Sequence, residues 1–108
     1  MEKRVEVNLL LDFYGALLTE HARELIRLYV EEDMSLQEIA DEKGVSRQAV
    51  HDSVSRSEKQ LIEYEDKLGL LKRFKAMNGR INEFKTQLDA AKTALAQAEQ
   101  ILSELQDM

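Results

Sequence analysis

The sequence predicts an all-α protein in which a helix-turn-helix domain is followed by a long C-terminal helix of coiled-coil type. Three observations lead to this prediction. The 108 residues contain no proline, whose ring breaks helix interiors, so long uninterrupted helices are permitted. A short capped segment, a glycine and a second capped segment follow one another in the middle of the chain. The last third repeats apolar residues at alternating spacings of three and four.

The N-terminal part of the chain predicts two amphipathic helices. Within residues 4–18, apolar side chains recur at i, i+3, i+4, i+7 and i+8, which marks one face of a helix. Thr19 interrupts this pattern, and its hydroxyl is suited to cap a second helix. The acidic run 31–33 closes that second helix, and its most economical interpretation is solvated surface. The expected buried faces consist of Leu10, Phe13, Tyr14, Leu17 and Leu18 in the first helix, and Ala22, Leu25, Ile26 and Tyr29 in the second.

The segment from Ser35 to Val50 predicts the helix-turn-helix itself. Ser35 and Glu38 have the spacing of a capping box, which marks the start of a short helix of about nine residues. Gly44 is suited to the left-handed conformation of a tight helix exit. Ser46 is a second capping candidate, and the helix that follows it is expected to reach about Lys67.

Small and apolar side chains are placed so that the two helices of this motif can pack closely. Ala40 permits close approach where the helices cross, and Val45 and Val50 are expected to fill the wedge between them. The remaining inward-facing positions are expected to be Leu36, Ile39, Val54 and Leu61.

The second helix of such a motif lies in the major groove when the motif binds DNA, with its N-terminal residues at the base edges. Arg47 and Gln48 have the donors to read guanine and adenine, and Arg56 and Lys59 are suited to phosphates. Asp52 opposes DNA binding unless it pairs with Arg56 four residues later. The alternative is a solvated helix face. The candidate nucleic-acid-binding or partner-binding residues are Arg47, Gln48, His51, Ser55, Arg56, Lys59, Lys72 and Arg73.

Charge weighs against strong binding to DNA. Fifteen basic and twenty-one acidic residues give a net charge of −6. Residues 1–34 carry four basic and eight acidic side chains, whereas residues 35–73 carry seven and eight, so the motif is near neutrality. Lys72, Arg73 and Lys75 form a small basic cluster at the start of the tail, which is either a solvated junction or a contact for RNA phosphates.

The tail carries an apolar stripe, called here the seam, at the a and d positions of five heptads. Such a stripe on an isolated helix requires a partner, and a homodimer is expected, with pairing within the chain as the alternative. Asn78 and Gly79 form a pair that could break the helix near its start. The seam consists of Phe74, Met77, Ile81, Phe84, Leu88, Ala91, Leu95, Ala98, Leu102 and Leu105.

Catalytic and metal chemistry find little support in the sequence. There is no cysteine, and the two histidines, His21 and His51, lie on different predicted helices, so no zinc site is expected. Four scattered glycines cannot build a phosphate-binding loop. We therefore expect no catalytic residues, no metal, no cofactor and no enzymatic activity. Without a signal-like or membrane-spanning apolar run, we expect a cytoplasmic protein that does not insert into membranes.

Three segments of the chain resemble the YlxM family of bacterial proteins. They are residues 8–18 with Leu11-Asp12-Phe13-Tyr14, the motif at 35–50, and residues 64–70 (Tyr64-Glu65-Asp66-Lys67-Leu68-Gly69-Leu70). The resemblance covers about residues 1–72. It implies a fold similar to region 4 of sigma factors and a role in the signal recognition particle pathway. The expected domains are a helix-turn-helix domain at 1–70, winged-helix-like and sigma-region-4-like, and a heptad helix for dimerisation at 71–108.

Three classes of function remain open from the sequence. The first is a regulatory or accessory protein of the signal recognition particle that binds its protein or RNA, as the resemblance implies. The second is a transcription regulator that binds duplex DNA through residues such as Arg47, Gln48, Ser55 and Arg56. The third is an interaction module whose motif has lost contact with nucleic acid. The acidic balance argues against the second class.

Overall fold

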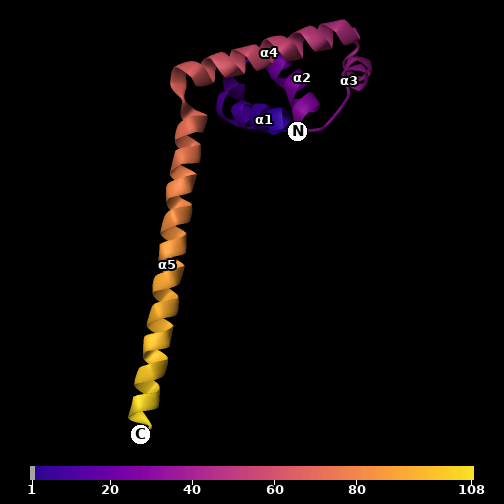
Figure 1. Ribbon diagram of the computed structural model, residues 1–108. Coiled ribbons are helices and arrows are strands. Elements are labelled where there is room, and N and C mark those ends of the chain that lie inside the picture. The colour runs from indigo at the N-terminus through magenta and orange to yellow at the C-terminus, as the bar shows by residue number, and fades with distance from the viewer. Residues whose placement is uncertain (1) are drawn as a thin grey trace. The chain divides into compact units, whose positions relative to one another are not determined.

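The computed structural model describes residues 2–108, which form five α-helices and one 3₁₀ turn and contain no strand (Figure 1). This result confirms the predicted all-α fold with a long C-terminal helix. The chain divides into two compact units, one ending at Leu71 and the other spanning Lys72–Met108. None of the helices in the described residues is long and apolar enough to span a bilayer. The elements are α1 (Glu2–Tyr14), η1 (Gly15–Leu17), α2 (Glu20–Val30), α3 (Leu36–Lys43), α4 (Arg47–Leu68) and α5 (Leu70–Gln106).

The first unit is organised around α4. Helices α1, α2 and α3 all pack against it, with α3 beside its N-terminal end (Figure 1). Ile26, Ile39 and Val50 bring one fully buried side chain each from α2, α3 and α4. These contacts bury the crossing point of the helix-turn-helix and set the orientation of α4 within this unit. The core consists of Val7, Leu10, Leu11, Tyr14, Leu18, Leu25, Ile26, Leu28, Val30, Ile39, Ala40, Val50, Val54, Leu61 and Leu71.

Local capping defines where these helices begin. The hydroxyls of Thr19, Ser35 and Ser46 each accept a hydrogen bond from the backbone N–H three residues later, at 3.0–3.2 Å. The Glu38 carboxylate returns a bond from the Ser35 N–H at 3.1 Å and completes the predicted capping box. Gly44 ends α3 with φ 69°, in the left-handed region that glycine adopts without strain. The predicted capped helix, glycine turn and capped helix are confirmed.

Two apolar residues that were expected to be buried are exposed instead. The first helix ends at Tyr14 rather than continuing to 18, and Leu17 lies in the 3₁₀ turn with 55% of its surface exposed. Gly15 begins this turn, where an added Cβ would lie 3.1 Å from Leu11 Cδ1. Val45, directly after the left-handed Gly44, is 36% exposed. Val50, the other residue expected in the wedge, is fully buried.

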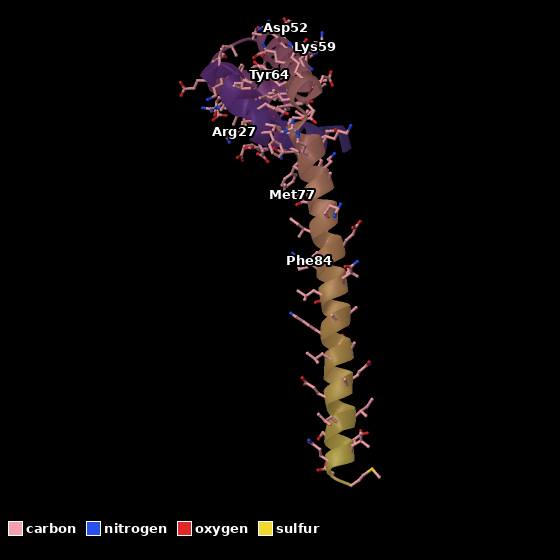
Figure 2. All side chains as sticks on the ribbon, turned by 90° about the vertical axis from the view of Figure 1, so that its left-hand side faces the viewer. Arg27, Asp52, Lys59, Tyr64, Met77 and Phe84 are labelled. Carbon is pink, nitrogen blue, oxygen red and sulfur yellow. The ribbon has the colours of Figure 1, made fainter. Side chains whose placement is uncertain are left out.

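The second unit consists of α5 from Lys72 onward and the last two residues, and α5 is continuous through Asn78 and Gly79. The pair Asn78 and Gly79, which could have broken the helix, does not interrupt it, because a single interior glycine costs only about 1 kcal/mol relative to alanine and many helical residues flank it. Every side chain from Lys72 to the end of the helix is exposed. The apolar residues of the seam are therefore all accessible, and Figure 2 shows Met77 and Phe84 on the same side of α5.

Candidate partner-binding surface on the second motif helix

The first half of α4 presents most of the candidate binding residues on one surface, called here the α4 face. Its basic members Arg47, Arg56 and Lys59 are exposed, and Ser55 is half-buried. The Ser46 cap and the buried Val50 and Val54 hold this part of α4 against the core, so the opposite side of the helix remains in solvent. The α4 face consists of Arg47, Gln48, His51, Asp52, Ser55, Arg56 and Lys59.

An open depression of about 520 Å³ lies within the α4 face, lined by His51, Asp52, Ser55, Arg56 and Lys59. Asp52 and Lys59 mark its position in Figure 2. In the part of the chain that the structure describes, no carboxylate forms an ion pair with Arg47, Arg56 or Lys59. Three cationic side chains on this surface are therefore available to an acidic group of a partner.

Asp52 lies at the centre of the α4 face and has partners on its own helix. Its Oδ1 accepts a hydrogen bond from Gln48 Nε2 at 2.9 Å and lies 3.3 Å from His51 Nδ1. The sequence suggested Arg56 as the residue that would neutralise Asp52, but in the described residues Asp52 contacts Gln48 and His51 instead. The Gln48 amide, which was expected to read adenine, is thus engaged within the protein.

Lys72 and Arg73 belong to the first turn of α5, in the second unit, and both side chains are exposed. A cation near a helix N-terminus is unfavourable with respect to the helix dipole. Their placement is therefore not explained by the electrostatics of α5 itself.

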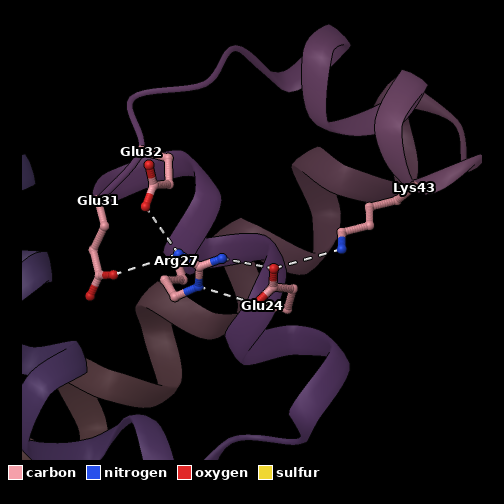
Figure 3. A network of polar contacts seen from close by, with 5 residues as sticks. All are labelled: Glu24, Arg27, Glu31, Glu32 and Lys43. Carbon is pink, nitrogen blue, oxygen red and sulfur yellow. Dashed lines mark hydrogen bonds and ion pairs between the residues drawn. The ribbon is translucent and has the colours of Figure 1, made fainter.

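A cluster of ion pairs around Arg27 was not predicted from the sequence (Figure 3). The guanidinium donates two hydrogen bonds to Glu24, from Nε at 3.1 Å and from Nη2 at 2.9 Å, and a third from Nη1 to Glu32 at 3.2 Å. Glu31 lies 4.0 Å from Nη1. Lys43 Nζ, at the end of α3, lies 3.6 Å from Glu24. Through Glu24 and Lys43, the cluster connects α2 to the last turn of α3.

The Arg27 cluster changes the titration of its central pair. The hydrogen bond from Arg27 lowers the pKa of Glu24, partial desolvation opposes that shift, and the charges of Arg27 and Lys43 add to it. The same hydrogen bond raises the pKa of Arg27 above its ordinary value. Spacings of three and four residues between acidic and basic side chains favour such pairs on a helix, and Glu24, Arg27 and Glu31 show that signal. The contact with Lys43 depends on the packing of two helices, which no local spacing reveals.

Arg4 makes a second contact between distant segments. Its guanidinium pairs with Asp33 in the loop after α2 and lies 4.9 Å from the centre of the Tyr29 ring, a cation–π distance. Asp33 has φ 57°, in the left-handed region that aspartate tolerates better than most residues. The Arg27 cluster, through Glu32, and Arg4, through Asp33, both contact the loop that leads into α3. The acidic run 31–33 thus has partners, and it is not merely solvated.

Comparison with known proteins identifies relatives along most of the chain. A family described as "UPF0122: Putative helix-turn-helix protein, YlxM / p13 like" matches residues 1–103. A UPF0122 protein of Clostridium botulinum is 51% identical over 73 residues, covering 68% of this chain and 67% of that protein. One of Symbiobacterium thermophilum is 50% identical over 90 residues, covering 83% and 84%. One of Bacillus mycoides is 39% identical over 108 residues, covering 100% and 98%.

Proposed function

Since this chain belongs to the YlxM/p13-like family of helix-turn-helix proteins, we propose that it is a non-catalytic accessory protein of the signal recognition particle pathway. In this proposal it acts in the cytoplasm and binds the particle's protein or RNA through the α4 face. The observation that carries the binding role is the exposure of Arg47, Arg56 and Lys59 without described carboxylate partners. The pathway itself comes from the resemblance to the YlxM family.

The paired charges of Glu24 and Arg27 in the first unit bear on the choice between a binding role and a catalytic one. Two groups with shifted pKa values, Glu24 and Arg27, pair with each other, and Glu24 also contacts Lys43 of α3. General acid–base catalysis needs a group of perturbed pKa that faces a reacting molecule. Glu24 and Arg27 instead hold α2 against α3, so this pair is assigned a structural role.

Recognition of duplex DNA is the second candidate function, and the exposure of Arg47 and Gln48 at the start of α4 favours it. Asp52 opposes it, because this exposed carboxylate lies among the cations of the α4 face and accepts a hydrogen bond from the Gln48 amide. A DNA reader must break that hydrogen bond and bring Asp52 close to a polyanion. For this reason we favour the particle's protein or RNA over duplex DNA as the ligand of the α4 face.

The proposal is tested by measuring binding of the purified protein to three separate probes: the signal recognition particle protein, its RNA, and random-sequence duplex DNA. We expect binding to one of the first two, and a loss of at least tenfold in affinity when Arg47 and Arg56 are both replaced by alanine. Lys67→Ala is the matched control, because it removes one positive charge from the end of the same helix, outside the α4 face.

The salt dependence of binding separates the outcomes. A polyanion bound through two or more of these cations loses affinity steeply as salt rises, and the double substitution reduces the slope by about two. Tight binding to duplex DNA alone, reduced by the same substitutions, would establish the DNA reader and refute the accessory role. Binding to the particle that is insensitive to Arg47 and Arg56 would leave the pathway in place and exclude the α4 face as the contact.

A further inference from the structure

The seam of α5 is a long stripe of exposed apolar side chains. Phe84, Leu95 and Leu105 are 61–64% exposed, and Phe74, Ile81 and Leu88 are 41–42% exposed. From Phe74 to Leu105 the stripe runs for about 47 Å at 1.5 Å per residue. Contiguous apolar surface of this extent is uncommon on a protein without a partner and marks an interaction site.

We propose that a second copy of this chain covers the seam, with the two α5 helices antiparallel. The register places Phe74 opposite Leu105 of the partner subunit and Leu88 opposite the partner's Ala91. In an antiparallel coiled coil, a positions face d positions of the other helix. The seam consists of five a and five d positions, so this register pairs all ten residues and leaves none unmatched.

The volumes of the seam residues favour this register. Bulky residues dominate the first half of the seam, whereas its second half contains both alanines. The antiparallel register sets Ile81 against the partner's Ala98, Leu88 against the partner's Ala91, and Phe84 against the partner's Leu95. Each small residue is thus covered by a large one, and no layer contains two aromatic rings, as close packing requires.

A parallel arrangement in register would place each residue against its own counterpart. The layers at Ala91 and Ala98 would then each contain two methyl groups and leave space unfilled. The layers at Phe74 and Phe84 would contain two aromatic rings and force the helices apart. The alanine layers require a short distance between the two helix axes, and the phenylalanine layers require a long one. Two straight helices cannot meet both requirements within a few turns, so the parallel form packs poorly along the seam.

Charge supports the same direction. Residues 72–89 carry five basic and two acidic side chains, a net charge of +3, whereas residues 90–107 carry one basic and three acidic, a net charge of −2. Antiparallel pairing places each positive half beside a negative half of the partner, and parallel pairing places like halves together. The attraction lies in the outer parts of the coil, because Lys85 and Lys92 both flank its centre.

These two observations also favour a second copy over a different protein. The C-terminal half of the seam contains the small residues and carries negative charge. The N-terminal half of the same helix has the large residues and the positive charge that complement it. A surface that is complementary to itself after a two-fold rotation describes an isologous homodimer. The N-terminal ends of the two seams would then lie about 47 Å apart.

The absence of cysteine from the chain permits a direct test by cross-linking the full-length protein. Ile81→Cys and Ala98→Cys variants are prepared separately, mixed, and treated with a short bis-maleimide. We expect cross-linked dimer in the mixture and little with either variant alone, because the two copies of position 81 lie 17 residues, about 25 Å, apart along an antiparallel coil. Thr93→Cys, outside the seam, measures cross-linking by random collision.

Light scattering of the unmodified chain is expected to give about 25 kDa, twice the 12.5 kDa of one chain. Efficient cross-linking of the Ile81→Cys variant with itself would establish the parallel form and overturn the proposal. A mass of one chain at concentrations of tens of micromolar would overturn it as well. Neither readout involves the signal recognition particle, so this proposal and the proposed function fail independently.

Discussion

The hydroxyl of Tyr14 donates a 2.7 Å hydrogen bond to Oε1 of Glu65, and the two oxygen atoms together cap the start of α5. The Leu70 N–H donates to the Tyr14 hydroxyl and the Leu71 N–H to the same Glu65 oxygen, both at 3.0 Å. The first N–H groups of a helix have no partner within it. Residues of α1 and α4 supply those partners directly after Gly69, which ends α4 with φ 64°.

Replacing Tyr14 by phenylalanine is expected to destabilise the fold by about 1–3 kcal/mol, because the Leu70 N–H and Glu65 both lose a partner in a part-buried region. The ring itself is retained, so the packing of this 1% exposed side chain is preserved. Urea unfolding followed by circular dichroism measures the change. Tyr64→Phe is the matched control, since that ring lies 6.0 Å from the Tyr14 ring but takes no part in the cap. Equal losses in the two variants would show that the hydrogen bonds are not the cause.

Two glycine substitutions are expected to change the stability of the protein in opposite directions. Gly44→Ala should destabilise the protein by about 1 kcal/mol, because alanine is strained at φ 69°. Gly79→Ala should stabilise α5 by about 0.5–1 kcal/mol, because this glycine is inside a helix and an added Cβ would meet nothing within 4 Å. Thermal unfolding of both variants measures the difference. A destabilised Gly79→Ala variant would contradict the continuous α5.

The Arg27 cluster is expected to contribute stability that depends on pH. The pKa of Glu24 is lower in the folded protein than its ordinary value of 4.5, so its contribution is present above that value and is lost as pH falls through the folded pKa. The wild type should exceed Glu24→Gln by about 1–2 °C in Tm at pH 7, as expected for a largely exposed pair, and the gap should close in acid. Glu63→Gln, an exposed carboxylate of α4, is the control. A gap that persists unchanged in acid would exclude the ion pair as its source.

Substitution within the seam should prevent assembly. Leu88→Lys places a charge in the central layer of the coil, and we expect the dimer dissociation constant to rise more than a hundredfold, because an unpaired charge in an apolar interface is poorly solvated. Thr93→Lys introduces the same charge on the outer side of α5 and should leave the dimer intact. Sedimentation or light scattering over a concentration series compares them. If Leu88→Lys keeps the mass of the unmodified chain, the seam is not the interface.

The helix starts could be predicted because capping is local. Thr19, Ser35 and Ser46 each bond to an N–H only three residues away, so the residue types and their spacing were sufficient. The exposed residues of the α4 face were identified for a similar reason, because the 3.6-residue period separates them from Val50 and Val54. Leu17 and Val45 were wrongly assigned to the core, since the pattern of apolar residues does not show where a turn directs a side chain.

By itself the sequence determined the all-helical class, the capped helix-turn-helix and the continuous apolar stripe of α5, all of which depend on residues within a turn or two of one another. Only the tertiary structure revealed the bond between Tyr14 and Glu65, the pairing of Arg4 with Asp33 and the reach of Lys43 to Glu24. These partners lie 51, 29 and 19 residues apart in the chain. Polar side chains at such separations meet only after the apolar faces of their helices have packed, and the geometry of that packing decides which of them come within bonding distance.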